Sequence, residues 1–159
     1  DLDYLGRTGR AIACLGQETM PSSKRESIGM IKPSGWKTQR YDDLISTKYL
    51  YNRCHLVGYQ LTGENANEKN LITCTRQMNI GPMLTYENKI ADYVKKTSNH
   101  VLYRVTPIFE GNNLLASGAL MEGYSVEDHG EGISFNIYVY NVQKGIEINY
   151  RTGESRLAS

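Results

Sequence analysis

The chain has 159 residues, with 18 lysines and arginines against 17 aspartates and glutamates. This length suits one domain with a substantial hydrophobic core, so we expect a single domain over residues 1–159. Hydrophobic residues make up 40% of the chain, which excludes a disordered or fibrous protein. No apolar run approaches the roughly 20 residues that a membrane-spanning helix needs, so we expect no membrane association. The net charge of +1 excludes a uniformly basic surface.

The first half of the chain contains short apolar runs separated by polar segments. The runs at residues 11–15, 28–31 and 49–61 predict strands, and the polar stretch that follows the third run predicts a loop. Residues 75–79 predict a short helix that Gly81-Pro82 interrupts.

The second half begins with the clearest helical pattern and then returns to strands. Apolar residues follow one stripe over residues 83–96: Met83, Tyr86, Ile90, Tyr93 and Val94. Further strands are predicted at residues 101–109, 114–124, 133–141 and 146–150. The order predicts an α+β fold with helices flanking a largely antiparallel central sheet.

The first residue and the cysteines do not decide whether the protein works inside or outside the cell. The chain begins at Asp1, so we expect that a leader was removed or that the chain was shortened. The cysteines, Cys14, Cys54 and Cys74, are too few for a disulfide scaffold and poorly spaced for structural zinc. One disulfide with one free thiol and three buried thiols are both open.

The segment at residues 51–55 carries candidate catalytic groups. Side chains alternate along a strand, so Arg53 and His55 share one face with Tyr51, while Asn52 and Cys54 face the other side. A histidine is the usual proton acceptor at neutral pH, and the planar guanidinium of arginine suits a phosphate. The open alternative is a half-exposed strand with two ordinary surface groups.

Three more polar residues accompany the predicted helices. Asn70 precedes the first helix and Asn79 lies on it, where asparagine often caps but also offers one neutral oxygen to Mg²⁺. Glu87 lies beside the apolar stripe. An acid so placed is paired, functional, or an edge residue that reaches water.

Together these stretches resemble the DNA/RNA non-specific endonucleases of the ββα-metal (His-Me finger) class, closest to the secreted streptodornase-type DNases. Residues 52–55, Asn-Arg-Cys-His, match the family's Asp-Arg-Gly-His motif. Asn70 and Asn79 match the family's two asparagines, and Glu87 falls where its glutamate is expected. The phrases GRTGRAIA, KPSGW and KGIEINYRTG extend the resemblance over most of the chain.

The resemblance implies a ββα-metal nuclease fold and a mechanism. His55 would be the general base, Arg53 would stabilise the phosphate or the site, and Asn70 would hold the site's polar geometry. Asn79 would hold Mg²⁺, or Mn²⁺, whose waters Glu87 would orient. The implied reaction is sequence-non-specific cleavage of DNA, and of RNA in addition, to 5′-phosphate ends. The implied location is extracellular, and we expect no obligate protein partner.

Four positions depart from the family's pattern: Asn52 for Asp, Cys54 for Gly, Cys74 for Gln and Ala91 for an Arg found in some members. A Cys54–Cys74 disulfide would join the strand to the helix entry, and two buried thiols is the open alternative. Without an arginine at position 91 another cation must serve the transition state, for which Lys24 and Arg25 are the candidates. The departures also favour an alternative function, a catalytically weakened nucleic-acid-binding or adhesion domain on the same scaffold.

The charges are strongly segregated along the chain. Residues 24–53 carry seven basic side chains against three acidic ones, whereas residues 110–131 carry five acidic side chains and no basic one. The basic segment leads into the candidate catalytic strand and predicts a track for a phosphate backbone. The predicted substrate-binding residues are Lys24, Arg25, Lys37 and Arg40.

Overall fold

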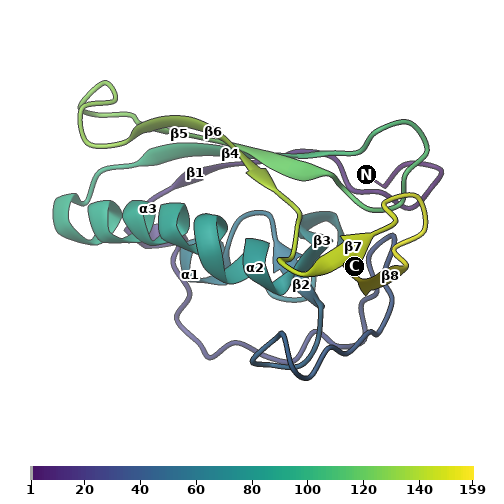
Figure 1. Ribbon diagram of the computed structural model, residues 1–159. Coiled ribbons are helices and arrows are strands. Elements are labelled where there is room, and N and C mark those ends of the chain that lie inside the picture. Colours follow the sequence, from purple (N-terminus) through teal and green to yellow (C-terminus); the bar gives the residue numbers. More distant parts are fainter. Residues whose placement is uncertain (1) are drawn as a thin grey trace.

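A four-stranded antiparallel sheet forms one layer of the molecule in this computed structural model, which describes residues 2–159. Its strand order is β1 (Ala11–Leu15), β4 (Val101–Ile108), β5 (Gly118–Ser125) and β6 (Ser134–Tyr140). In Figure 1 this sheet lies at the top, with the long helix α3 (Leu84–Thr97) beneath it. The predicted α+β architecture with a largely antiparallel sheet is confirmed.

The sheet packs on α3 because its strands alternate. Val101, Tyr103 and Val105 of β4 are buried on the face toward the helix. The helix contributes the predicted apolar stripe, from which Ile90 and Val94 are completely buried. Burial of a large aliphatic side chain stabilises a fold by about 1.5–3 kcal/mol, so this interface holds the main core together.

A smaller unit of two strands and a helix lies on the other side of α3 (Figure 1). Strand β2 (Tyr51–His55) pairs antiparallel with β3 (Leu71–Thr75), and α1 (Tyr59–Thr62) and the short turn η2 (Glu68–Asn70) lie between them. In the part of the chain that the structure describes, β2 pairs with β3 alone, so its other edge has no strand partner.

Strand β3 runs directly into helical backbone. The Thr75 hydroxyl accepts a hydrogen bond of 3.1 Å from the backbone N–H of Met78 and so begins α2 (Arg76–Met78). A wide turn, η3 (Asn79–Met83), connects α2 to α3. Gly81 departs from helical backbone there and Pro82 lacks an N–H donor, so the predicted interruption is confirmed and takes the form of a kink.

One predicted strand is wrong, and another is longer than the strand in the structure. Residues 28–31 form a turn closed by the Ile31 N–H and the Ile28 carbonyl, and the carbonyls of Gly29 and Ile31 accept hydrogen bonds from Arg53 instead of a strand. Residues 49–61 contribute only β2, because the chain bends after His55 and continues into α1. The C-terminal strand β7 (Ile146–Ile148) pairs with β8 (Ser155–Leu157), which the sequence pattern did not predict.

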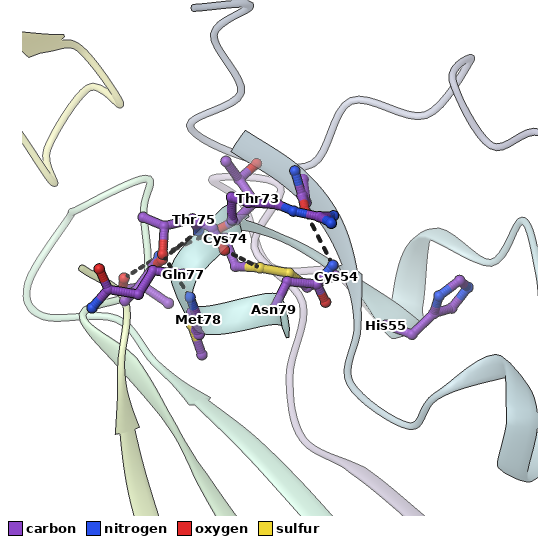
Figure 2. Close-up of a disulfide and its surroundings, with 12 residues drawn as sticks. Cys54, His55, Thr73, Cys74, Thr75, Gln77, Met78 and Asn79 are labelled. Carbon is purple, nitrogen blue, oxygen red and sulfur yellow. Dashed lines mark hydrogen bonds between the residues drawn. A yellow bond between two sulfur atoms is a disulfide. The ribbon is translucent and has the colours of Figure 1, made fainter. Parts of the chain in front are cut away.

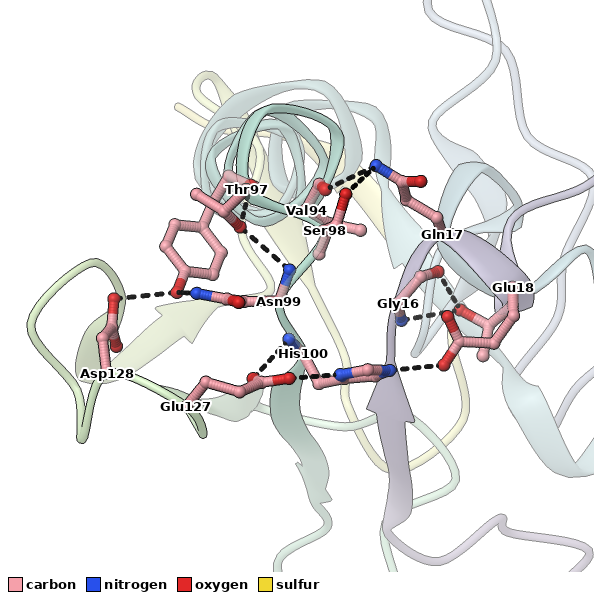
Figure 3. Close-up of polar contacts among 12 residues, drawn as sticks. Gly16, Gln17, Glu18, Val94, Thr97, Ser98, Asn99, His100, Glu127 and Asp128 are labelled. Carbon is pink, nitrogen blue, oxygen red and sulfur yellow. Dashed lines mark hydrogen bonds and ion pairs between the residues drawn. The ribbon is translucent and has the colours of Figure 1, made fainter.

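The segment after β1 is fastened to α3 and to the sheet (Figure 3). A short turn, η1 (Gln17–Thr19), follows β1, and the Gln17 amide donates to the Val94 carbonyl and the Ser98 hydroxyl at the end of α3. The ring of His100 bridges Glu18 and Glu127, and these carboxylates raise its pKa above the ordinary value. The segment that leads to Arg25 therefore begins at residues that are hydrogen-bonded to α3 and to His100.

Within residues 2–159 the structure contains no helix that is long and apolar enough to cross a bilayer.

Candidate active site

Two adjoining cavities lie along β2, and we refer to them together as the cleft. One has a volume of about 590 Å³ and is lined by aromatic and polar residues that include Trp36, Tyr49 and Asn52. The other has a volume of about 370 Å³ and is lined by His55 and Glu87. Three residues line both cavities: Arg25, Arg76 and Asn79.

The cleft collects side chains from both faces of β2. The sequence pattern placed Asn52 and His55 on opposite faces of the strand. In the structure Asn52 lines the first cavity and His55, the last residue of β2, lines the second. They share one cleft because the strand edge between the two faces has no strand partner. Asn52 and His55 thus line the same cleft even though they lie on opposite faces of β2.

His55 is held in one tautomer. Its Nε2 lies 2.8 Å from the carbonyl oxygen of Asn65, which only accepts hydrogen bonds, so Nε2 carries the proton. The basic lone pair is left on Nδ1, which lies 3.4 Å from Nη2 of Arg25. Burial lowers the pKa of His55, the Arg25 charge lowers it further, and the Asn65 hydrogen bond opposes them. The side chain is therefore a neutral base at physiological pH.

Asn79 offers its amide oxygen to the cleft. Its Nδ2 donates a hydrogen bond of 3.1 Å to Oδ1 of Asn52, which leaves its own Oδ1 without a protein donor among residues 2–159. The same Asn52 oxygen accepts a hydrogen bond of 3.2 Å from Nη1 of Arg76. Asn52 therefore orients both Asn79 and Arg76 at the start of the helical segment.

Glu87 of α3 lies in the second cavity and packs against Gly58. A Cβ atom at Gly58 would overlap Oε2 of Glu87, so a larger residue here would require the carboxylate to move. Burial raises the pKa of Glu87 to about 8, although the Arg25 charge acts in the opposite direction. A divalent cation nearby would favour the ionised carboxylate instead.

The donor set fits a hard cation that keeps most of its waters. No cluster of three or more His, Cys, Asp or Glu side chains with metal-binding geometry occurs in residues 2–159. The available ligands are the Asn79 amide oxygen and, beyond it, the Glu87 carboxylate. Mg²⁺ is typically bound by one or two protein oxygens with several waters, whereas a structural zinc site needs four protein ligands.

Arg53 donates hydrogen bonds to backbone carbonyl groups of the protein. Its guanidinium lies 3.9 Å from the centre of the Trp36 ring, donates to the Gly29 carbonyl at 3.0 Å and donates to the Ile31 carbonyl. Burial lowers its pKa below the ordinary value. These contacts fasten the turn at residues 28–31 across β2, so Arg53 lines the cleft mainly as part of its wall.

Asn70 is buried and supports the cleft from behind. Its Oδ1 accepts a hydrogen bond from the Val57 N–H and its Nδ2 donates to the Val57 carbonyl, both at 3.0 Å. This pair of bonds fixes the bend between His55 and Gly58. Asn70 is not among the residues that line either cavity.

A disulfide joins Cys54 of β2 to Cys74 of β3, so the alternative of two buried thiols is wrong. The two residues are 20 positions apart in the chain, with Cα atoms 5.8 Å apart, and both are completely buried. Figure 2 shows the bond crossing between the strands, while the His55 ring points away from it. Cys14 is exposed and free. The departures from the family's Gly and Gln are thus one change, since each cysteine bonds the other.

The predicted basic track reaches the cleft only in part. Arg25 lines both cavities, but Lys24 and Lys37 are exposed side chains that line neither. Arg40 forms an ion pair with Asp42. Sequence reasoning missed Arg76, whose only signal was a basic residue between the two matched asparagines.

The comparisons with known proteins agree with the motif match. A family model described as DNA/RNA non-specific endonuclease matches residues 1–127. A curated deoxyribonuclease from Streptococcus dysgalactiae subsp. equisimilis is 30% identical over 110 residues, which cover 66% of this chain and 32% of that protein. The chain thus spans about a third of the length of this relative.

Solved structures share the fold over nearly the whole chain. The Sda1 nuclease with bound zinc superposes with a TM-score of 0.81 at 27% identity, covering 100% of this chain and 79% of that one. NucA from Streptococcus agalactiae with magnesium bound superposes with a TM-score of 0.88 at 24% identity, covering 99% and 76%. An extracellular nuclease superposes with a TM-score of 0.73 at 22% identity, covering 99% and 90%.

Proposed function

The chain belongs to the DNA/RNA non-specific endonuclease family, and from this we propose that it is a Mg²⁺-dependent endonuclease that cleaves DNA without sequence preference. RNA is proposed as a second substrate, because backbone recognition carries little base information. Manganese is proposed as an alternative ion, since both are hard cations that prefer oxygen ligands. The observation that carries the proposal is the His55 tautomer, which leaves Nδ1 unprotonated and facing Arg25 in a cleft that Asn79 and Glu87 also line.

In the proposed reaction His55 removes a proton from the attacking water. The water oxygen bonds to phosphorus, the proton passes to Nδ1, and the bond from phosphorus to the 3′ oxygen breaks while that oxygen takes a proton from a solvent water. The products carry a 5′-phosphate and a 3′-hydroxyl. The Asn65 carbonyl keeps the imidazole oriented and stabilises the imidazolium, in the way that an acceptor behind a catalytic base usually does.

Asn79 would hold the cation directly, through the oxygen that Asn52 leaves free. When bound, the cation supplies charge stabilisation for the phosphate and for the leaving oxygen. Glu87 would accept hydrogen bonds from the surrounding waters and orient them. Arg25 would keep His55 neutral and attract the backbone, while Arg53 and Asn70 would hold the walls of the cleft. Lys24, Lys37 and Arg40 are proposed only as outer contacts for the nucleic acid.

An extracellular location is proposed as well. A completely buried disulfide is typical of proteins that fold in oxidising compartments. Two of the structural neighbours are described as extracellular nucleases, in agreement with this proposal.

The test is incubation of supercoiled plasmid with the protein and Mg²⁺, with EDTA in a parallel sample. We expect nicked, then linear, then degraded DNA, with EDTA abolishing the change. End-labelling before and after phosphatase treatment should show 5′-phosphate ends. Intact plasmid that migrates more slowly would contradict the proposal and favour the alternative, a binding domain on the same scaffold.

A further inference from the structure

The arginines of the cleft differ from most other arginines in the molecule. Four arginines outside it form ion pairs with a neighbouring carboxylate: Arg7, Arg40, Arg104 and Arg156. Among residues 2–159 no carboxylate lies within 4 Å of the guanidinium groups of Arg25, Arg53 or Arg76. Unpaired guanidinium groups that gather at one cleft form a site for an anion.

Two of these three arginines already serve protein groups. Arg53 stacks on Trp36 and donates to the backbone of the turn at residues 28–31. Arg25 lies against His55, where its charge adds to burial in lowering the pKa of the base. Arg53 is thereby held in the wall of the cleft, and Nη2 of Arg25 is engaged by the base.

Most N–H groups of the Arg76 guanidinium have no acceptor among the described residues. A guanidinium has five N–H donors, and the contact of 3.2 Å from Nη1 to the neutral amide oxygen of Asn52 uses one. Its Nε is buried and has no hydrogen-bond partner among the described residues. An unsatisfied buried donor costs about 1–3 kcal/mol, and the N–H groups on the terminal nitrogens that no group in residues 2–159 uses are left for an acceptor from outside the protein.

The position of Arg76 matches the path that a phosphate must take. The residue lies one helical turn before Asn79 and lines both cavities of the cleft. Asn52 orients it without neutralising it, whereas a carboxylate at that position would form an ion pair and cancel its charge. Some family members have an arginine on α3 where this chain has Ala91. Ala91 is buried in the core, so α3 supplies no cation from that position.

We propose that Arg76 binds the scissile phosphate and stabilises the charge that develops on it, as the transition-state cation of this site. The inference rests on the proposed nuclease function for its catalytic part. Binding of a phosphate backbone to Arg76 in the absence of metal does not depend on cleavage and is measured separately.

The experiment compares Arg76→Met, Arg76→Lys and the control Arg151→Met, whose exposed side chain lies outside the cleft. Plasmid cleavage with Mg²⁺ should fall about 10²-fold or more in kcat for Arg76→Met, in line with loss of one charge-stabilising donor. Arg76→Lys should recover part of the loss, and Arg151→Met should match wild type. Thermal unfolding of each variant checks the fold.

A metal-free readout separates phosphate binding from support of Asn79. Anisotropy of a labelled duplex in EDTA should show at least about tenfold weaker binding for Arg76→Met. Asn52→Asp should also weaken this binding, since it adds a counter-charge 3.2 Å from Arg76 without removing a side chain. Unchanged binding, with activity restored by high Mg²⁺, would assign Arg76 to positioning Asn79 and overturn the proposal.

Failure of the proposed function would look different. If wild type binds the duplex through Arg76 but never cleaves it, the binding part of the inference stands and the nuclease is contradicted. If wild type does not cleave DNA and the Arg76→Met variant binds the duplex as tightly as wild type, the proposed nuclease function and the role of Arg76 are both contradicted.

Discussion

The Nδ1 atom of His55 lies 3.4 Å from Nη2 of Arg25, a residue 30 positions earlier in the chain. The contact places a permanent cation beside the nitrogen that we assign as the base. Repulsion between the guanidinium and a protonated imidazole lowers the pKa of His55 beyond the effect of burial. Arg25 is thereby linked to the pH dependence of the reaction.

The first prediction concerns that pH dependence. Because neutral His55 is required, activity should fall as the pH drops through a pKa below the ordinary 6.5. Arg25→Ala removes the repulsion, so the acid limb of the kcat/KM profile should move to higher pH. Lys24→Ala is the matched control and should leave the limb in place. An acid limb that stays unmoved in Arg25→Ala would contradict the assigned contact.

The second prediction tests the packing of Glu87 on Gly58. Gly58→Ala should displace the carboxylate, since the added Cβ has no space, and lower plasmid cleavage by at least about tenfold. The backbone φ of Gly58 is −60°, which alanine adopts without strain, so the helical and strand content should be retained in circular dichroism. Gly9→Ala adds a Cβ in open space and serves as the control. Equal activity in the two variants would mean that Glu87 is not needed in this position.

The third prediction follows from the pKa of Glu87, which burial raises to about 8. The folded state binds this proton more tightly than the unfolded state, so the stabilisation is complete below about pH 4.5 and is lost as pH rises through 8. In EDTA, wild type should lose on the order of 4 kcal/mol relative to Glu87→Gln between pH 5 and pH 9. Denaturant unfolding at several pH values measures the difference.

Comparing wild type with Glu87→Gln also cancels the contribution of the other titrating groups to the pH dependence of stability. His100 also has a raised pKa and His55 a lowered one, but both are present in wild type and in Glu87→Gln. Parallel stability curves for the two proteins would show that Glu87 titrates normally.

The fourth prediction concerns the Cys54–Cys74 disulfide. A bond that closes a loop of this size stabilises a protein by about 3 kcal/mol through the unfolded chain. Cys54→Ala with Cys74→Ala should therefore lower the Tm by roughly 6–12 °C and weaken activity, since β2 carries His55 and β3 leads to Asn79. Cys14→Ser should change neither quantity, because Cys14 is free and exposed. A double variant with the wild-type Tm would contradict the stabilising role.

The sequence predicted the helix α3 and the later strands well because their apolar residues repeat with clear periods. It failed at residues 28–31, where an apolar run forms a turn whose carbonyl groups bind Arg53. That contact joins positions 22 and 24 residues apart, which no local pattern contains. Strand β8 was missed because three residues at a polar C-terminus carry no alternation.

The candidate site was predicted from motif spacing, which selects residues but not their contacts. His55, Asn79 and Glu87 line one cavity, as the motif match requires. The pattern could not indicate that Asn52 orients Asn79, that Gly58 makes room for Glu87, or that Arg76 enters the cleft. Each of these depends on how β2 packs against the helical segment after β3.

The central claim, that His55 is the general base of a nuclease, is tested most directly by the rate of plasmid cleavage in His55→Ala. His129→Asn is the control, because His129 is an exposed histidine with φ 55°, a conformation that asparagine tolerates. With Mg²⁺ at saturation, His55→Ala should cleave about 10²-fold more slowly or worse, while folding normally and binding metal-free DNA. His129→Asn should retain the wild-type rate. A His55→Ala protein that degrades plasmid at the wild-type rate would contradict the account.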